Sequence, residues 1–360
     1  MKESVVWRGG RAESVYDAFR IPGIIVTNKG TLIIYGEARD YQNILGIHCD
    51  WAAIDIVMKR STDGGETWSD TKILCGGANA ASPEGLRTTN NPVMIADGNT
   101  IHMVYCTWCA LERTGGGVFY IKSEDDGITW SEPKNISKEC YTDEYNRCLC
   151  VTGPGHGVVM SGKSRNPGML LVPVWMTPVK DGNDMEHFPN VVSTLYSLDK
   201  GDTWQLGKVI YSTDKVIDPN ESAAVELSDG GVMLNMRNEG SAGWRAVTVS
   251  GTGYDNWSAP YFDETLIDPV CFGSIVRYDI NTLLFVNCAS ESSRTNLTVR
   301  VSRDDGKTWE ASRSIAQNAG YSDIAVGEDG MIYVLYEINA GEISMNLLRF
   351  DLDWIYNNIK

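Results

Sequence analysis

Short runs of apolar residues recur along the whole chain, each rich in β-branched or aromatic side chains and bounded by Gly, Asp or Asn. Runs of this length between turn-forming residues are typical of β-strands. Long amphipathic patterns with helix caps are scarce. The pattern therefore predicts an all-β chain, with strands at Gly23–Val26, Thr31–Tyr35, Ile101–Tyr105, Val118–Ile121, Met169–Val174, Gly231–Met236, Thr282–Asn287 and Met331–Tyr336.

A short signature, S-x-D-x-G-x-T-W, occurs at Ser61–Trp68, Ser123–Trp130, Ser197–Trp204 and Ser302–Trp309. A degenerate fifth copy, Ser250–Trp257, divides the long interval between the third and fourth copies about equally. Ser and Asp side chains bind backbone groups of a tight turn, Gly supplies a left-handed conformation, and Trp packs beneath the turn. The signature therefore predicts a repeated hairpin turn with a structural rather than a catalytic role.

The spacing of these copies predicts a closed ring of repeated sheets. Together with a final set of strands that lacks the signature, the five copies make six units of about 60 residues, which suits a six-bladed β-propeller of four-stranded antiparallel blades. The last strands, Ile332–Glu337 and Ile343–Phe350, need an N-terminal strand such as Ser4–Trp7 to close the ring and remove the sheet edge. Since nothing resembles a linker, residues 1–360 are expected to form a single domain.

Composition and charge narrow the possible partners. The chain is 42% hydrophobic and contains 36 Gly and 11 Trp, so it has ample material for a large core. Its formal net charge is −16, which disfavours nucleic acid or an anionic membrane as the main partner. Neither the composition nor the net charge indicates an oligomeric state.

The nine cysteines include Cys106-x-x-Cys109 and Cys148-x-Cys150, but no second Cys-x-x-Cys matches them and the chain has only four His. We therefore expect reduced thiols, no zinc site and no cofactor. The first residues, MKESVVWRGG, lack the apolar stretch of a signal peptide. As it stands, the sequence predicts a cytoplasmic protein, or a secreted one if an N-terminal segment has been trimmed.

A second set of motifs accompanies the signature. In order, these are Phe19-Arg20-Ile21-Pro22, Gly153-Pro154-Gly155-His156-Gly157, Asn220-Glu221, Leu234-Asn235-Met236-Arg237 and Tyr321-Ser322-Asp323. This set resembles the sialidases (neuraminidases), retaining exo-α-sialidases with a FRIP motif and Asp boxes, and the resemblance spans nearly the whole chain. It implies a catalytic six-bladed propeller with its active site at one mouth of the axis, away from the boxes. It also implies terminal α-linked sialic acids of oligosaccharides, glycoproteins or glycolipids as substrates.

The sialic acid carboxylate calls for fixed cations, and Arg suits it because its planar fork pairs carboxylate oxygens bidentately and stays charged. By resemblance, the matching triad is Arg20, Arg237 and Arg294, with Arg300 as the competing third member. Arg39, in Glu37-Ala38-Arg39-Asp40, resembles the family Arg near the substrate 4-hydroxyl. Glu337 is expected to orient Arg20 through an ion pair.

A neutral phenol avoids the repulsion that a carboxylate nucleophile would meet at an anomeric carbon bearing a carboxylate, and sialidases are the noted Tyr-nucleophile exception among glycosidases. Because the free phenol pKa is near 10, the nucleophile needs a base. Tyr321 matches the family nucleophile and Glu221 its base, with Tyr336 as the rival nucleophile. Asp50 is the candidate general acid, similar to the family D-x-x-x-x-D-T stretch, and Asp55 is the alternative.

One departure from the family pattern affects specificity. Where many bacterial sialidases carry Met-Asp-Pro, this chain reads Asn90-Asn91-Pro92, so Asn91 replaces a charged substrate-binding residue by a neutral hydrogen-bonding one. The sugar could then be an N-acetyl, N-glycolyl or deaminated sialic acid, and transfer or anhydro-sugar formation stays open. Trp108 and Trp175 are either pocket walls or core residues. A catalytically silent sugar-binding propeller is the alternative from another class.

Overall fold

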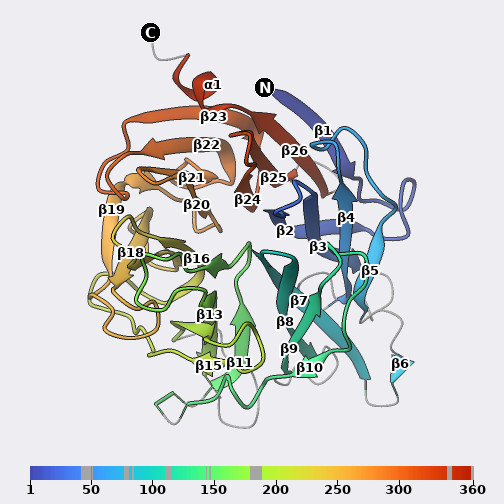
Figure 1. The fold of residues 1–360 in the computed structure, drawn as a ribbon, viewed down its shortest axis with the longest axis horizontal. Coiled ribbons are helices and arrows are strands. Elements are labelled where there is room, and N and C mark those ends of the chain that lie inside the picture. Colours follow the sequence, from blue (N-terminus) through green and yellow to red (C-terminus); the bar gives the residue numbers. More distant parts are fainter. Residues whose placement is uncertain are drawn as a thin grey trace.

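The computed structural model describes residues 1–41, 50, 52–76, 81–82, 85–109, 116–142, 144–145, 147–178, 189–338 and 343–357. These residues form six antiparallel sheets arranged around a central axis (Figure 1). The predicted all-β, six-bladed propeller is therefore confirmed.

Each blade has a core of four strands in meander order. From the axis outward, the first blade consists of β2 (Ala18–Val26), β3 (Leu32–Asp40), β4 (Ala53–Ser61) and β5 (Lys72–Gly76). The second consists of β7 (Gly85–Asp97), β8 (Thr100–Cys109), β9 (Val118–Ser123) and β10 (Lys134–Asn135), with the short β6 (Ala81–Ser82) beside β7. The third consists of β11 (Arg147–Thr152), β13 (Leu170–Pro178), β14 (Val191–Ser197) and β15 (Gln205–Leu206), with β12 (Val158–Val159) also pairing with β13.

The remaining three blades follow the same order. The fourth consists of β16 (Pro219–Glu226), β17 (Val232–Asn238), β18 (Trp244–Ser250) and β19 (Tyr261–Ile267). The fifth consists of β20 (Ser274–Asp279), β21 (Thr282–Cys288), β22 (Thr295–Ser302) and β23 (Ala311–Asn318). The sixth consists of β24 (Ser322–Val326), β25 (Ile332–Ile338), β26 (Ser344–Phe350) and, from the other end of the chain, β1 (Lys2–Trp7).

The ring closes through the N-terminal strand. Strand β1 pairs antiparallel with β26, from Lys2 opposite Arg349 to Trp7 opposite Met345, as the sequence predicted for Ser4–Trp7. A short helix, α1 (Leu352–Tyr356), follows β26. Among the described helices, none has the length and apolar character needed to cross a membrane.

The Asp boxes connect the third strand of a blade to its fourth. In the first box, Ser61 Oγ accepts a hydrogen bond from the Gly65 N–H at 2.8 Å, and Asp63 Oδ1 accepts one from the Thr67 N–H at 2.9 Å. The degenerate copy keeps the first contact, because the Gly253 N–H donates to Ser250 Oγ at 3.0 Å. The sixth blade has no box because its fourth strand comes from the N-terminus and needs no such turn.

The core lies between neighbouring blades. One cluster, for example, packs Ile24 and Ile34 of the first blade against Leu335 and Leu347 of the sixth. All eight strands predicted from the apolar runs coincide with strands of the structure, and four of them begin one residue later than predicted. The apolar runs thus bury both faces of the sheets and hold the inner strands in place around the axis.

Candidate active site

A cavity of about 210 Å³ lies at the axis, among the inner strands. Arg20 lies near the start of β2 and Arg39 near the end of β3, whereas the first Asp box follows the end of β4. Because neighbouring strands run antiparallel, the start of the first strand and the end of the second meet at one edge, and the end of the third lies at the opposite edge. The cavity therefore opens at the mouth away from the boxes, as the resemblance implied.

All the predicted catalytic and substrate-binding residues line this cavity. They are Arg20, Arg39, Asp50, Asn91, Glu221, Arg237, Arg294 and Tyr321. Glu337, predicted to have a supporting role, lies behind Arg20 and is fully buried.

Two of the inner strands, β2 and β7, contain a backbone bulge beside the cavity. The β2–β3 register shifts between Arg20 and Gly23, and Ile21 in that bulge has a φ of 58°. The β7–β8 register shifts between Asn90 and Val93, and Asn91 has a φ of 50°. A positive φ is strained for a β-branched residue such as Ile21, and strain of this kind clusters at functional sites. The bulges re-aim side chains at the mouth of the cavity.

Arg20 is held by a buried carboxylate. Its Nε donates to Glu337 Oε1 at 3.2 Å and its Nη2 to Glu337 Oε2 at 3.3 Å. The same carboxylate accepts from the backbone N–H groups of Ile21 at 2.8 Å and Tyr321 at 3.3 Å. Glu337 therefore fixes the FRIP strand and the candidate nucleophile relative to each other.

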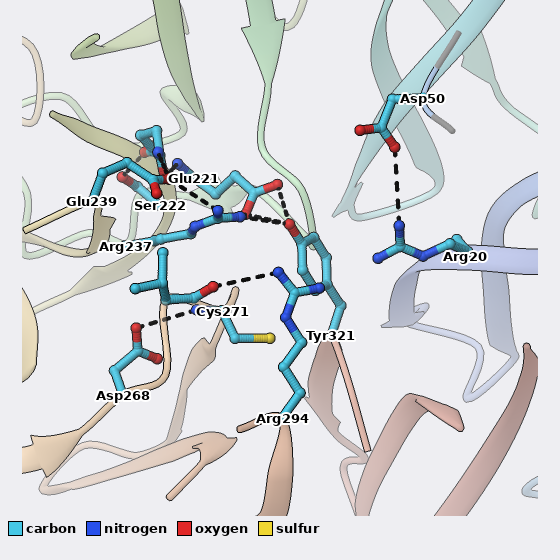
Figure 2. Close-up of polar contacts among 12 residues, drawn as sticks. Arg20, Asp50, Glu221, Ser222, Arg237, Glu239, Asp268, Cys271, Arg294 and Tyr321 are labelled. Atoms are coloured by element: carbon cyan, nitrogen blue, oxygen red, sulfur yellow. Dashed lines mark hydrogen bonds and ion pairs between the residues drawn. The ribbon is translucent and has the colours of Figure 1, made fainter. Parts of the chain in front are cut away.

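Tyr321, Glu221 and Arg237 form one hydrogen-bonded group (Figure 2). The Tyr321 hydroxyl lies 2.7 Å from both carboxylate oxygens of Glu221. Arg237 Nη1 donates to Glu221 Oε2 at 2.7 Å and to the Tyr321 hydroxyl oxygen at 2.8 Å. The phenol is thus placed between a carboxylate that can accept its proton and a cation that can stabilise the oxyanion.

The third arginine of the cluster is Arg294. Its guanidinium lies 5.1 Å from the centre of the Tyr321 ring, and that of Arg20 lies 5.4 Å from the same point. Arg300, the competing candidate, is buried elsewhere and donates from Nη1 to Asn287 Oδ1 at 2.8 Å. The structure therefore brings Arg20, Arg237 and Arg294 together around the Tyr321 ring, which Figure 2 shows at the centre of the group.

The electrostatics of Tyr321 favour a protonated resting state. Burial raises the pKa of Tyr321 well above its ordinary value, and the Glu221 carboxylate raises it further. Arg237 and Arg294 act in the opposite direction and lower the pKa. The hydroxyl therefore keeps its proton at rest and donates it in a hydrogen bond to Glu221.

Asp50 lies at the open side of the cavity, with 61% of its side chain exposed. Arg39 Nη1 donates to Asp50 Oδ1 at 2.7 Å, and Arg20 Nη1 lies 3.9 Å from the same oxygen. Asp55, the alternative acid, is buried and accepts a hydrogen bond from the Tyr16 hydroxyl at 2.6 Å. Its carboxylate is not among the groups that line the cavity.

Tyr336, the rival nucleophile, does not line the cavity, and its hydroxyl donates to Glu3 Oε1 at 2.5 Å. Trp175 lines the cavity and also packs against apolar residues of the third and fourth blades, so it is both a wall and a core residue. The side chain of Trp108 lies outside the described residues.

Sequence reasoning missed an outer layer of acids that hold the arginines. Glu37 is fully buried and accepts from Arg39 Nε at 2.9 Å, and its Oε1 accepts from the Asn91 N–H at 2.8 Å. Glu239 Oε1 accepts from Arg237 Nη2 at 2.9 Å. Each acid lies two residues from its arginine, Glu37 on β3 and Glu239 just after the end of β17. The alternation of side chains along an extended chain would have placed each acid on the same face as its arginine.

One wall of the cavity was predicted only in part. It comes from the third blade, where Trp175, already a candidate wall from the sequence, and Thr177 of β13 adjoin Leu149 and Val151 of β11, which were not predicted. This wall is mainly apolar and faces the charged side of the cavity. In the sequence, the members of each pair, Leu149 and Val151 or Trp175 and Thr177, are two residues apart and therefore share a face of their strand. This spacing alone does not distinguish a cavity wall from the core.

The arrangement combines a cation cluster, a phenol hydrogen-bonded to a carboxylate, and an exposed carboxylate across the cavity. Such a group can bind an acidic ligand, form a covalent bond through the phenol, and transfer a proton to or from a second oxygen. Among the described residues, there is no group of three or more His, Cys, Asp or Glu side chains that could hold a metal ion.

Comparisons with known proteins agree with the resemblance read from the motifs. The chain is 27% identical over 362 residues to a sialidase from Bacteroides fragilis, covering 92% of this chain and 62% of that protein. It is 27% identical over 369 residues to a sialidase from Micromonospora viridifaciens, covering 94% of this chain and 52% of that protein. The solved structure of Hadza microbial sialidase Hz136 superposes with a TM-score of 0.80 at 26% identity, over 95% of this chain and 67% of that one.

The chain thus spans less than two thirds of the length of both curated sialidases. A family model, the BNR repeat-like domain, matches residues 51–334, which include all the Asp boxes. The chain therefore belongs to the family of BNR repeat-like domains.

Proposed function

We propose that this chain is an exo-α-sialidase, a glycoside hydrolase that removes terminal α-linked sialic acids from glycoconjugates with retention. The observation that carries the proposal is the convergence of Arg20, Arg237 and Arg294 around Tyr321, whose hydroxyl lies 2.7 Å from Glu221. The similarity to sialidases over most of the chain supports it.

The three arginines bind the substrate carboxylate. In a chain with a net charge of −16, a cavity that gathers three guanidinium groups selects an anionic ligand. Planar guanidinium forks pair with carboxylate oxygens bidentately, so they fix the orientation of the sugar as well as its charge. A cavity of only about 210 Å³ suits one terminal sugar better than an internal stretch of a glycan, which agrees with exo-acting cleavage.

The first chemical step forms a bond between the Tyr321 oxygen and the anomeric carbon. The phenol proton passes to Glu221, while the bond from the anomeric carbon to the leaving oxygen breaks and Asp50 protonates that oxygen. The phenol approaches as a neutral group, so it avoids the repulsion that a carboxylate nucleophile would meet beside the substrate carboxylate. Arg237, 2.8 Å from the phenol oxygen, stabilises the charge that develops there.

The second step hydrolyses the covalent intermediate. Asp50, now ionised, removes a proton from a water molecule that attacks the anomeric carbon, and the bond to Tyr321 breaks as Glu221 returns its proton to the phenol oxygen. Two inversions at one carbon give net retention. Arg39 holds Asp50 at 2.7 Å and, with Asn91, faces the sugar from the side of the first two blades.

The test is turnover of a fluorogenic sialoside by the wild type, Tyr321→Phe and Asp50→Ala. We expect Tyr321→Phe to lose at least about 1,000-fold in kcat, because it lacks the nucleophilic oxygen, and NMR of early product to show retention. Equal hydrolysis by all three proteins would overturn the assignment of roles. Product analysis also separates hydrolysis from transfer and from anhydro-sugar formation.

A related sugar acid is the second candidate substrate. Asn91 lines the cavity as a neutral residue, so this side chain cannot discriminate among substituents by charge. Parallel turnover of the sialoside and its deaminated analogue decides between them. A sugar-binding propeller without catalysis would have no need of the contact between Tyr321 and Glu221, and inactivity toward both substrates would favour it.

A further inference from the structure

Asp323 and His156 come from two sequence motifs that the proposed reaction leaves without a role. The Asp323 carboxylate is fully buried and accepts three hydrogen bonds. The Ile24 N–H donates to Oδ2 at 2.8 Å, Ser274 Oγ donates to Oδ1 at 2.6 Å, and His156 Nδ1 lies 2.8 Å from the same Oδ1. Since an ionised carboxylate only accepts, the His156 Nδ1 carries the proton.

These three donors belong to three other blades. Ile24 lies on β2, four residues after Arg20, and Ser274 begins β20, just after the loop whose Val270 carbonyl accepts from Arg294 Nη2 at 3.4 Å. His156 follows β11, whose residues form the apolar wall of the cavity. One carboxylate at the axis therefore joins four of the segments from which the site is built.

Asp323 is also two residues from Tyr321. Tyr321 lies immediately before β24 and Asp323 lies within it, and side chains two apart on an extended segment point to the same side. We propose that the Asp323–His156 pair is a positioning element for Tyr321, which fixes the phenol relative to Arg20 and Arg294. An error of about 1 Å in the position of a reacting group can cost about 100-fold in rate.

The charges around His156 support an ion pair. Burial lowers the pKa of His156, but Asp323 raises it more, and the net direction is upward. A second cavity, of about 330 Å³, adjoins His156 and is lined by two other charged residues, Glu226 of β16 and Arg277 of β20. Both are engaged elsewhere, Glu226 with Ser161 at 2.9 Å and Arg277 with Asp305 at 2.6 Å. The positive charge of His156 therefore balances the negative charge of Asp323, so neither is left as an isolated buried charge at the axis.

This inference rests on the proposed sialidase reaction, and Asp323→Asn tests it. The variant keeps the shape of the side chain and removes its charge. Asp126→Asn is the matched control, because Asp126 is also a buried carboxylate that joins blades, accepting from Thr31 and Arg60 at 2.7 Å each, but lies at the box end. Ser274→Ala, which removes one bond of the network, is the milder companion in case Asp323→Asn folds poorly.

We expect Asp323→Asn to lower kcat for the fluorogenic sialoside by about 10- to 100-fold while KM changes less than about threefold, because the arginines still bind the carboxylate. Asp126→Asn should lower Tm but leave kcat within twofold. An unchanged kcat in both Asp323→Asn and Ser274→Ala, or an equal loss in Asp126→Asn, would overturn the positioning role.

An NMR titration separates this inference from the proposed function. With only four His in the chain, the His156 signal can be assigned by substitution. Its pKa should fall in Asp323→Asn and stay unchanged in Asp126→Asn, whichever substrate the protein uses. If the wild type does not cleave sialosides, the proposed function fails, and a crystal structure of Asp323→Asn then decides whether Tyr321 has moved away from Glu221.

Discussion

The two ends of the propeller use the same kinds of polar side chain, but in local contacts at one end and in long-range contacts at the other. At the box end, Asp63 binds Thr67, four residues away, and the turn closes on itself. At the cavity end, Tyr321 binds Glu221 across 100 residues, and Arg20 binds Glu337 across 317. The Asp at the third position of each complete box stabilises a local turn that neighbouring blades repeat, whereas Glu221 and Glu337 hold together groups that no single blade supplies. Stability and chemistry are therefore separable by position, and matched substitutions at the two ends can test that separation.

The largest expected contrast is between Arg237→Lys and Arg60→Lys. Both arginines are mostly buried and bind a carboxylate at 2.7 Å, Arg237 at the cavity and Arg60, with Asp126, at the box end. Lysine keeps the charge but loses the planar fork. We expect kcat/KM for a sialoside to fall about 100- to 1,000-fold in Arg237→Lys and to stay within twofold in Arg60→Lys. Comparable losses in the two variants would show that the ends are not independent.

Glu337→Gln tests whether the contact between Glu337 and Arg20 affects substrate binding. The substitution leaves Arg20 without its ion-pair partner and weakens the acceptor for two backbone N–H groups. Removing one partner of a buried pair leaves an uncompensated charge, so we expect unfolding free energy to fall by about 3 kcal/mol and KM to rise about tenfold. Denaturant unfolding and initial rates measure the two effects.

Glu226→Gln is the matched control, because Glu226 accepts two hydrogen bonds from Ser161, both at 2.9 Å, at the end of β16 away from the cavity. Its KM should be that of the wild type. A wild-type KM in Glu337→Gln would mean that Arg20 keeps its orientation without the carboxylate.

The same division explains what the sequence could predict. The Asp boxes and apolar runs are local patterns, and from them the six blades, the closing strand at Ser4–Trp7 and eight strand positions followed correctly. The site residues came from motif resemblance, and the structure places them around one cavity. The single-domain organisation and the catalytic roles stay predictions.

What the sequence could not provide is the partner of each charge. Arg294 and Arg300 are six residues apart, yet Arg294, just before β22, lies at the cavity, whereas Arg300, within β22, is buried beside Asn287. Likewise, Asp50 lines the cavity, whereas the carboxylate of Asp55 accepts a hydrogen bond from Tyr16, a residue of a distant segment. Which charged side chains meet depends on how distant segments pack together, and no local pattern encodes that packing.

His102 gives a pH-dependent effect of intermediate size away from the cavity. Burial lowers the pKa of His102 to about 4, and its Nδ1 lies 2.8 Å from the Tyr120 hydroxyl. The folded protein thus keeps His102 neutral, while the unfolded chain binds a proton below about pH 6.5. Stability is therefore complete above that pH and declines toward pH 4, by about 2 kcal/mol from this group. Denaturant unfolding at pH 7.0 and 4.5 should show a smaller decline in His102→Gln than in the wild type.

The smallest effect is expected from a single box carboxylate. Hydrogen bonds from the Thr129 hydroxyl at 2.6 Å and the Thr129 N–H at 2.8 Å lower the pKa of Asp125 to about 2. Its contribution to stability is present above about pH 4, where the unfolded carboxyl is already ionised, and is lost as pH falls toward 2. Because the group is exposed to solvent, which weakens such contacts, Asp125→Ala should lower Tm by no more than about 3 °C at pH 7. Activity should be unchanged, since neighbouring boxes hold their own turns through separate contacts. A loss of activity without a change in Tm would show that the box end communicates with the cavity, and the separation of the two ends would fail.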